Sequence, residues 1–388
     1  MPTDGRLRWR ELHPQGVEDE PLVHRPASRR QVGVVKGQHR KRHDLGKAGI
    51  TWKPRRSDSW GFLAAAALLI VVSVVVDRWH APSPSTTSFT STDPPPAGGY
   101  FPTLVRPGNV TALPDGNTCA RAVHYSSWEP RPDNYKRNHV MVDAAAVHNS
   151  FSSRPRSGSG SYDLGWDSWL LPRVDGQFSG TTDEIIQWAA CKWGLPDNYL
   201  RAEADTESTW FQYETYPSGR CVGQVGCGDW FRSEPYVARK TYCDGLATAG
   251  GHDYQSDYGD GYCPKTFSIV GIMSWWNPSW GFTWAGNQNG TLPFTRNSTA
   301  MALDYMASQI RGCYEGWQWE LGSSYTSGDL WGCAGAWYSG GWHDSGANTY
   351  ISHVQANESA EPWLTTSFAT EKPPCDPSYG CPGPDPLP

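Results

Sequence analysis

Residues 188–210 read WAACKWGLPDNYLRAEADTESTW, and the rest of the chain is organised around this stretch. A capping box, Thr181 with Glu184 three residues later, begins a helix just before it. Gly194 supplies the left-handed conformation that ends this helix, and Pro196 can open the next helix in its first turn. The stretch therefore predicts two helices joined by a tight corner.

The second of these helices ends with a glutamate whose position has a chemical consequence. Leu200, Ala204 and Glu207 lie at i, i+4 and i+7, so Glu207 ends the apolar stripe instead of facing open water. The negative end of the helix dipole and partial burial near Trp210 both favour the protonated carboxyl. A glutamate that keeps its proton near neutral pH can act as a general acid. The structural alternative is that Glu207 is an ordinary helix carboxylate in solvent. Glu203, one turn earlier, is the control, because it is equally helical but has no motif around it, so we do not expect it to be the catalytic acid.

Residues 1–59 form a basic segment without helical or strand periodicity. The segment carries 14 Lys and Arg against 7 Asp and Glu, a net charge of +7. This composition predicts a disordered cytoplasmic tail. We expect no nucleic-acid binding, because the segment has neither interleaved aromatic residues nor a nucleic-acid motif.

Residues 60–76 read WGFLAAAALLIVVSVVV, seventeen positions without a charge. About 17–25 such residues are needed to cross a bilayer. Because Arg55 and Arg56 precede the run, we expect a signal-anchor helix in the plasma membrane, with a cytoplasmic N-terminus and an extracytoplasmic C-terminal domain. A cleaved signal peptide is the alternative, but the run begins late and no small-x-small site is clear. Residues 77–99, rich in Pro, Ser and Thr, predict an extended linker.

The composition beyond the membrane segment fits an oxidising compartment. All ten cysteines lie there, at positions 119, 191, 221, 227, 243, 263, 313, 333, 375 and 381. Five disulfides are plausible and their pairing stays open; zinc is the alternative, although no CxxC or HxxxH accompanies the cysteines. Residues 79–388 carry 18 Lys and Arg against 31 Asp and Glu, a net charge of −13, which argues against a polyanionic ligand. Eighteen of the 21 tryptophans follow residue 78, and we expect most in the core and some in a glycan-binding groove.

Helical patterns dominate this outer region, so the predicted fold class is mainly α with long disulfide-bearing loops. We divide it into an irregular N-terminal extension (residues 100–180), a main domain (residues 181–365) and a Pro-rich tail (residues 366–388). Residues 297–312 predict a helix that Gly312 ends.

The main domain contains a long insertion, residues 211–267, which reads as a loop with four of the cysteines. Three of its carboxylates could hold calcium: Asp253, Asp257 and Asp260. Their spacing does not match an EF-hand, so a solvated loop is the simpler interpretation.

Four short motifs follow one another along the main domain. They are Trp193-Gly194-Leu195-Pro196 ahead of Glu207-Ser208, Gly271-Ile272-Met273-Ser274, Ala336-Trp337-Tyr338-Ser339-Gly340, and Tyr350-Ile351. Their order resembles the lysozyme-like fold of soluble lytic transglycosylases and goose-type lysozymes, over about residues 183–355. Two positions depart from the family pattern: Ser274 stands where the family has glutamine, and Trp337-Tyr338 where it has Tyr-Asn.

The resemblance implies cleavage of the β-1,4 bond between N-acetylmuramic acid and N-acetylglucosamine in peptidoglycan, with Glu207 as general acid and then base. In a lytic transglycosylase the muramyl C6 hydroxyl then closes an anhydro ring, whereas in a lysozyme water attacks. The residues that it places along the glycan strand are Ser208, Met273, Ser274, Trp275, Trp337, Tyr338 and Tyr350. It implies no metal and no cofactor.

Two alternatives remain open at this point. A hydrolase would need a second carboxylate, and the single-acid mechanism is favoured because the candidates lack motif support: Asp205, Glu214 and Asp344. The other class of protein is a non-catalytic, membrane-tethered glycan-binding or scaffold protein on the same fold. An enzyme should hold Glu207 near a polar partner in an open groove, whereas a binder could bury or pair it. Either protein could work with cell-wall or secretion machinery.

Overall fold

The computed structural model describes residues 92–153, 166–212, 236–250, 253–264, 266–272 and 290–371. All of them belong to one compact unit. The basic tail and the membrane segment at residues 60–76 lie outside the described residues. Within the part of the chain that is described, no helix is both long and apolar enough to cross a membrane.

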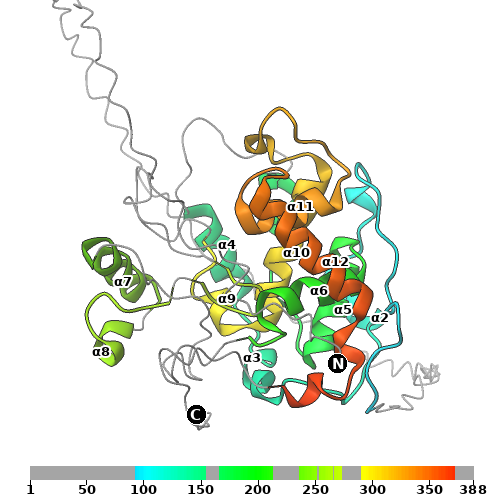
Figure 1. The fold of residues 1–388 in the computed structure, drawn as a ribbon, viewed down its shortest axis with the longest axis horizontal. Helices are drawn as coiled ribbons and strands as arrows, with labels where there is room; N and C mark the ends of the chain where they lie inside the picture. Colours follow the sequence, from blue (N-terminus) through cyan, green and yellow to red (C-terminus); the bar gives the residue numbers. More distant parts are fainter. Residues whose placement is uncertain are drawn as a thin grey trace, which may run out of the picture. The chain divides into compact units, whose positions relative to one another are not determined.

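The described residues are mainly α-helical, as the sequence predicts, and contain no strand. One antiparallel bridge joins Phe267 and Ile272. The helices in Figure 1 are α2 (Gly116–Ala122), α3 (Tyr135–Asn138), α4 (Ala144–Ser153), α5 (Thr182–Trp193), α6 (Asp197–Ser208), α7 (Tyr236–Gly250), α8 (Tyr254–Tyr258), α9 (Phe294–Asn297), α10 (Thr299–Glu315), α11 (Leu330–Ser339) and α12 (Ser345–Ala360).

The corner between α5 and α6 forms as predicted. The Thr181 hydroxyl accepts a hydrogen bond from the Glu184 amide (3.3 Å), and Glu184 Oε2 accepts one from the Thr181 amide (2.8 Å). Gly194 ends α5 at φ 62°, and a Cβ there would lie 2.6 Å from Leu113. Only glycine combines this backbone conformation with so close a neighbour. Pro196 is the residue just before α6 rather than its first residue.

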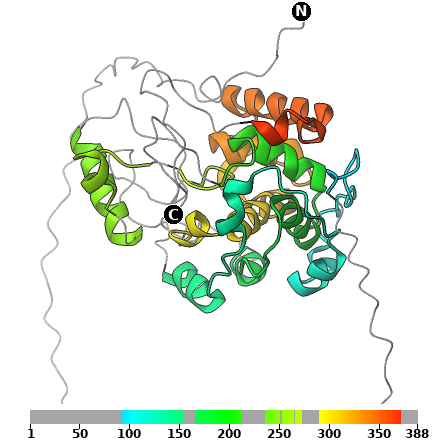
Figure 2. The same ribbon diagram turned by 90° about the horizontal axis from the view of Figure 1, so that it is seen from below.

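The helices that flank this corner form the centre of the packed region. α5 packs against α2, α6 and α10, and α12 packs against α6 and α11. Figures 1 and 2 show α5, α6, α10 and α12 side by side. Their shared core includes Trp188, Trp193, Leu200 and Met301, none of which is exposed. Because α6 is enclosed by α5 and α12, its last turn lies at a fixed place inside the protein.

The prediction that Gly312 ends α10 is wrong. The helix continues past it, and Gly316 ends α10 at φ 95°. Tertiary contacts hold the intervening residues in the helix, because Cys313 is bonded to Cys333 of α11 and Tyr314 is buried. A glycine inside a helix costs only about 1 kcal/mol, which such contacts outweigh.

Three disulfides join described residues, which confirms cysteine pairing for that part of the chain. Cys119–Cys191 links α2 to α5, Cys243–Cys263 links α7 to the chain after α8, and Cys313–Cys333 links α10 to α11. The other four cysteines, at 221, 227, 375 and 381, lie outside the described residues.

The insertion at residues 211–267 contains two helices, α7 and α8, where the sequence predicts a loop. α7 forms because Tyr242, Cys243 and Leu246 give it a buried stripe. Asp253 caps α8 by accepting a hydrogen bond from the Gln255 amide (3.0 Å). In the described part of the chain, no three His, Cys, Asp or Glu side chains are grouped to hold a metal ion.

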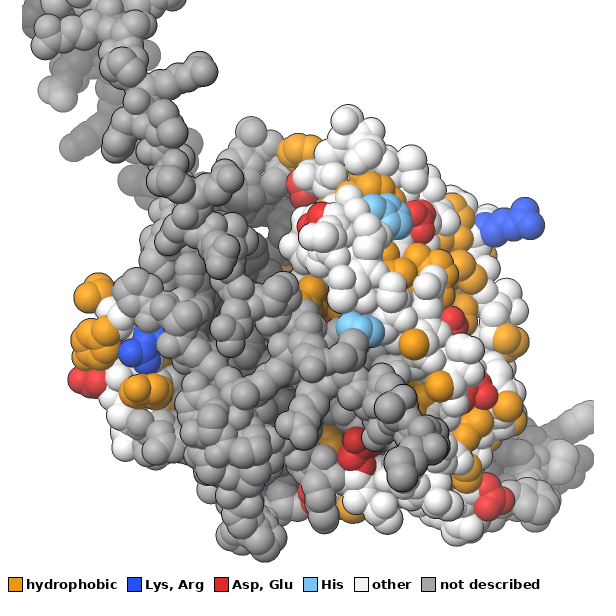
Figure 3. Space-filling view, in the orientation of Figure 1, with side chains coloured by type: hydrophobic (Ala, Val, Ile, Leu, Met, Phe, Trp, Pro, Cys, Tyr) orange, Lys and Arg blue, Asp and Glu red, His pale blue; other side chains and the backbone are white. Residues whose placement is uncertain are grey.

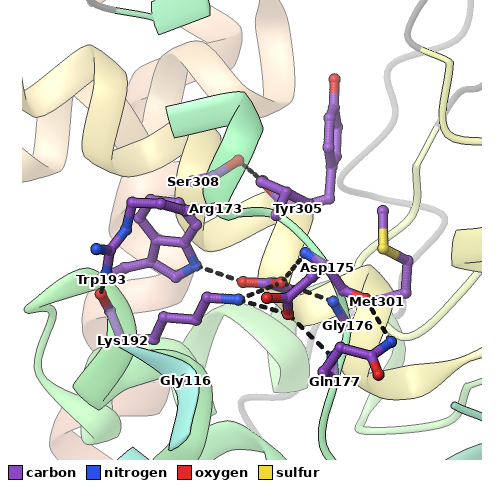
Figure 4. Close-up of polar contacts among 12 residues, drawn as sticks. Gly116, Arg173, Asp175, Gly176, Gln177, Lys192, Trp193, Met301, Tyr305 and Ser308 are labelled. Atoms are coloured by element: carbon purple, nitrogen blue, oxygen red, sulfur yellow. Dashed lines mark hydrogen bonds and ion pairs between the residues drawn. The ribbon is translucent and has the colours of Figure 1, made fainter. Parts of the chain in front are cut away.

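A buried ion cluster fixes α5 against α10 (Figure 4). Asp304 of α10 accepts hydrogen bonds from Lys192 Nζ (2.8 Å), the Trp193 indole N–H (2.7 Å) and the amides of Asp175 and Gly176 (both 2.9 Å). Lys192 Nζ also pairs with Asp175 Oδ1 at 2.8 Å. Because both Asp304 oxygens and the ammonium group have partners, the cluster is a structural link between the two helices.

The described surface shown in Figure 3 carries scattered acidic side chains and few Lys or Arg. Part of the positive charge lies inside the protein, because Arg131, Arg201 and Arg311 are each at most 1% exposed. Arg201 pairs there with Asp183 and Asp197 (both 2.7 Å). The face in view therefore offers little attraction to a polyanion, in keeping with the negative balance of the outer region.

Candidate active site

Glu207 lies in the last turn of α6, and only 7% of its surface is exposed. The two residues that follow the helix, Thr209 and Trp210, have left-handed backbone conformations (φ 52° and 65°). Such conformations are costly for residues other than glycine, so the surrounding structure must hold them.

A buried arginine from the N-terminal extension supplies part of that support. Arg131 Nε donates a hydrogen bond to the Thr209 carbonyl (2.7 Å), and the guanidinium lies over the Phe368 ring (3.9 Å to its centroid). Asn134 Nδ2 donates to the Trp210 carbonyl (2.7 Å). The extension and the chain around Phe368, which is fully buried, therefore meet at the end of α6 and hold it.

Two donors from other helices converge on one oxygen of Glu207. The Tyr350 hydroxyl of α12 donates to Glu207 Oε1 (2.7 Å), and the Trp337 indole N–H of α11 donates to the same atom (3.1 Å). These two residues lie 143 and 130 positions from Glu207 in the sequence. The site thus joins side chains of three helices, and it brings together three residues that the sequence nominates: Glu207, Trp337 and Tyr350.

The other oxygen of Glu207 faces a glycine. Among the described residues, both donors reach Oε1 and none is placed on Oε2. A Cβ built on Gly271 would lie 2.6 Å from Oε2, and Gly271 has φ 61°. Oε2 therefore lies against Gly271, where only a glycine fits, and among the described residues it is the oxygen of Glu207 that accepts no hydrogen bond.

Ser208 secures the segment that carries Gly271. The Ser208 hydroxyl donates to the Ile269 carbonyl (2.8 Å), and Gln212 Oε1 accepts a hydrogen bond from the Ile269 amide (3.2 Å). The Ser208 side chain therefore fixes the backbone at Ile269, and it does not form a hydrogen bond with the Glu207 carboxyl.

Burial dominates the acid–base properties of the site. It raises the pKa of Glu207 to about 7, while the hydrogen bonds from Tyr350 and Trp337 lower it. It raises the pKa of Glu203 to about 8, and the charges of Glu207 and Glu358 act in the same direction. A carboxyl with a pKa near 7 exchanges its proton readily at neutral pH, which a general acid requires.

The remaining nominated residues divide into three groups. Tyr338 stacks on Tyr350, with ring centroids 4.8 Å apart and planes 9° apart. Asp344 caps α12 by accepting a hydrogen bond from the Ala347 amide (2.7 Å), and Asp205 lies two positions from Glu207, off its helical face. The residues outside the described part of the chain are Met273, Ser274, Trp275 and Glu214.

Glu203, the control without a motif, is not an ordinary surface carboxylate. Glu203 is fully buried, and its two oxygens meet the hydroxyl groups of Tyr199 and Tyr350. One local signal could have indicated this, because Tyr199 and Glu203 are four residues apart on one helical face. The contact with Tyr350 depends on chain packing and leaves no such signal.

Comparison with protein-family models, known proteins and solved structures found no match. The fold and the site define a disulfide-linked helical domain with a buried pair of carboxyls at the end of one helix.

Proposed function

We propose that this chain is a membrane-anchored, peptidoglycan-cleaving enzyme in which Glu207 is the general acid and base. One observation carries the proposal: Glu207 is held at Oε1 by two donors from separate helices, while Oε2 lies against Gly271 with no donor among the described residues, and the pKa is about 7. This arrangement fixes a carboxyl and leaves one of its oxygens to transfer a proton.

The bond cleaved is the β-1,4 link between N-acetylmuramic acid and N-acetylglucosamine. Glu207 Oε2 gives its proton to the glycosidic oxygen as the bond from that oxygen to the muramyl C1 breaks, through an oxocarbenium-like transition state. The carboxylate that remains is stabilised by the Tyr350 O–H and the Trp337 N–H, which are already in place. Glu207 then accepts a proton from the muramyl C6 hydroxyl as O6 bonds to C1 and closes an anhydro ring.

The lysozyme-like fold is part of the same proposal. Its support is the order of the helices, with α5 and α6 ahead of α10, α11 and α12. Trp337 stands where the family pattern has a tyrosine, and its indole N–H supplies the donor to Glu207. The departure from the pattern therefore keeps a hydrogen-bond donor at that position.

The single-acid route is preferred over a hydrolase. Asp344 is engaged in capping α12, and Asp205 does not share the helical face of Glu207.

Anchoring through residues 60–76, with this domain outside the plasma membrane, is supported by the disulfides, which persist in oxidising compartments. A partnership with cell-wall or secretion machinery belongs to the same proposal.

One observation favours the alternative, a non-catalytic glycan-binding protein. Glu207 is 7% exposed and paired with two donors, as a purely structural carboxyl would be. Against it, Trp337, which donates to Glu207, and its neighbour Tyr338 are both partly exposed, so side chains that reach the surface lie beside the carboxyl.

The test is digestion of purified peptidoglycan by the oxidised full-length chain in detergent, with mass spectrometry of the soluble products. Glu207→Gln removes the acid, and Glu320→Gln makes the same change at an exposed position. Anhydromuramyl ends that vanish only in Glu207→Gln support a lytic transglycosylase, and reducing ends that vanish support a lysozyme. Sedimentation of the wild-type protein with peptidoglycan without any release would favour the binding protein.

A further inference from the structure

Glu203 is a buried carboxyl that the proposed reaction does not use. It lies one turn before Glu207 on α6, and none of its surface is exposed. Its Oε1 meets the Tyr199 hydroxyl and its Oε2 meets the Tyr350 hydroxyl. Burying a carboxyl is costly unless its hydrogen bonds are complete, so the positions of the protons in this group matter.

Tyr350 lies between the two carboxyls and has one proton to give. Its hydroxyl contacts Glu203 Oε2 and lies 2.7 Å from Glu207 Oε1. If both carboxyls were charged, one of them would face a hydroxyl oxygen with no proton between the two atoms. In a buried site that contact is repulsive, so one of the two carboxyls must carry a proton.

The contacts assign that proton to Glu203. Glu203 Oε1 accepts from Tyr199, so a proton on Oε2 can be donated to the Tyr350 oxygen. Tyr350 is then free to donate to Glu207 Oε1, beside the Trp337 N–H. In the opposite arrangement Glu207 would direct its own proton from Oε1 toward Tyr350, and Oε2 would have no proton to transfer.

The groups around Glu203 favour its neutral form. Tyr199 and Glu207 face it from α6, and Tyr350 and Glu358 face it from α12. The Trp331 ring of α11 packs edge-on against Tyr199, with centroids 5.7 Å apart. Because these neighbours are acidic or uncharged, none of them stabilises a negative charge on Glu203 as a cation would.

We propose that Glu203 is a positioning residue, which keeps a proton on Oε2, donates it to Tyr350 and thereby turns the Tyr350 hydroxyl toward Glu207. The inference rests on the proposed function and adds a proton relay to it. Ionisation of Glu203 would draw the Tyr350 proton back and remove a donor from the carboxylate that Glu207 forms during bond cleavage.

Two substitutions at Glu203 separate positioning from packing. Glu203→Gln keeps an N–H donor for Tyr350 and an oxygen for Tyr199, whereas Glu203→Leu keeps volume but neither polar group. Losing a hydrogen bond to a charged group is worth about 1.5–3 kcal/mol, so at pH 6 we expect kcat/KM on peptidoglycan to fall about 10- to 150-fold in Glu203→Leu. The Gln variant should stay within about threefold of wild type, and in a Tyr350→Phe background Glu203→Leu should cause no further loss.

A second readout does not depend on catalysis. Between the ordinary glutamate pKa of 4.5 and a pKa of about 8, folded Glu203 holds a proton that the unfolded chain has lost. The unfolding free energy of the wild type therefore falls as the pH rises through that window, and Glu203→Gln should reduce the fall. The measurement is urea unfolding of the full-length oxidised chain from pH 5 to pH 9.

The outcomes distinguish the two proposals. A Leu variant as active as wild type, a Gln variant as impaired as Leu, or additive losses with Tyr350→Phe would overturn the positioning role. An unchanged pH dependence of stability in Glu203→Gln would overturn the proton on Glu203 whether or not the protein cleaves peptidoglycan. If the wild type releases nothing while Glu203→Gln flattens the stability curve, the enzyme proposal and the positioning role fail together, and the proton assignment alone stands.

Discussion

Replacing Gly271 by alanine would place a Cβ 2.6 Å from Glu207 Oε2. Real Cβ contacts do not come this close, so either the carboxyl or the backbone of the Gly271 segment must move. The backbone is held by Ser208, which donates to the Ile269 carbonyl at 2.8 Å. We therefore expect the Glu207 carboxyl to rotate away from residue 271 and to lose its alignment with Tyr350 and Trp337.

The size of the effect follows from two separate costs. Alanine at φ 61° costs about 1–2 kcal/mol, because its Cβ crowds the backbone in the left-handed region. Overpacking a buried site adds about 1–3 kcal/mol. Gly271→Ala should therefore lower the free energy of unfolding by about 2–5 kcal/mol and reduce peptidoglycan cleavage by at least about tenfold.

A matched variant isolates the contact from the backbone strain. Gly108 has φ 82°, and no atom lies within 4 Å of the place where an alanine methyl group would stand, so Gly108→Ala carries only the first cost. Urea unfolding and initial rates of muropeptide release would be measured for both variants. Equal destabilisation of the two variants, or wild-type cleavage by Gly271→Ala, would refute the reasoning that a glycine is required beside Glu207 Oε2.

Three further predictions concern the surroundings of the same carboxyl. Trp337→Phe keeps a ring but removes the N–H on Glu207 Oε1, and it should slow cleavage about tenfold while Trp319→Phe, at an exposed position, leaves the rate unchanged. Glu207→Gln should abolish cleavage yet stabilise the fold above pH 7. The pKa of Glu207 is about 7 in the folded protein and 4.5 ordinarily, so the free energy of unfolding of the wild type falls by up to about 3 kcal/mol as the pH rises between these values. Urea unfolding at pH 5 and pH 8 would show this gain at pH 8 alone, and an equal effect at both would contradict it. Arg131→Met leaves the Thr209 carbonyl without its donor and should lower the free energy of unfolding by about 2–4 kcal/mol. Chemical denaturation measures this loss, and an unchanged free energy of unfolding would contradict the role of Arg131.

The parts of the fold that could be predicted depend on signals close together in the sequence. The capping box at Thr181 and the glycine at 194 act within one turn of the helix they bound, so the corner before α6 follows from the sequence. Gly312 does not end its helix because the disulfide from Cys313 to α11 outweighs the local preference.

The site could be predicted only in part for the same reason. Glu207 can be recognised from its place at the end of an apolar stripe, which is a local pattern. The burial of Glu203 depends on Tyr350, 147 residues away, and the support of Thr209 depends on Arg131, 78 residues away. Contacts of this kind arise from packing, and no single stretch of sequence contains them.

The disulfide between Cys313 and Cys333 ties the site to the redox state of its surroundings. It closes a loop across 20 positions and is worth about 3 kcal/mol by the loop-entropy relation. The helix that it fastens, α11, is the one that brings the Trp337 N–H to Glu207. A newly made chain kept under reducing conditions would hold that helix less firmly, so oxidation of this cysteine pair would steady the Trp337 donor at Glu207.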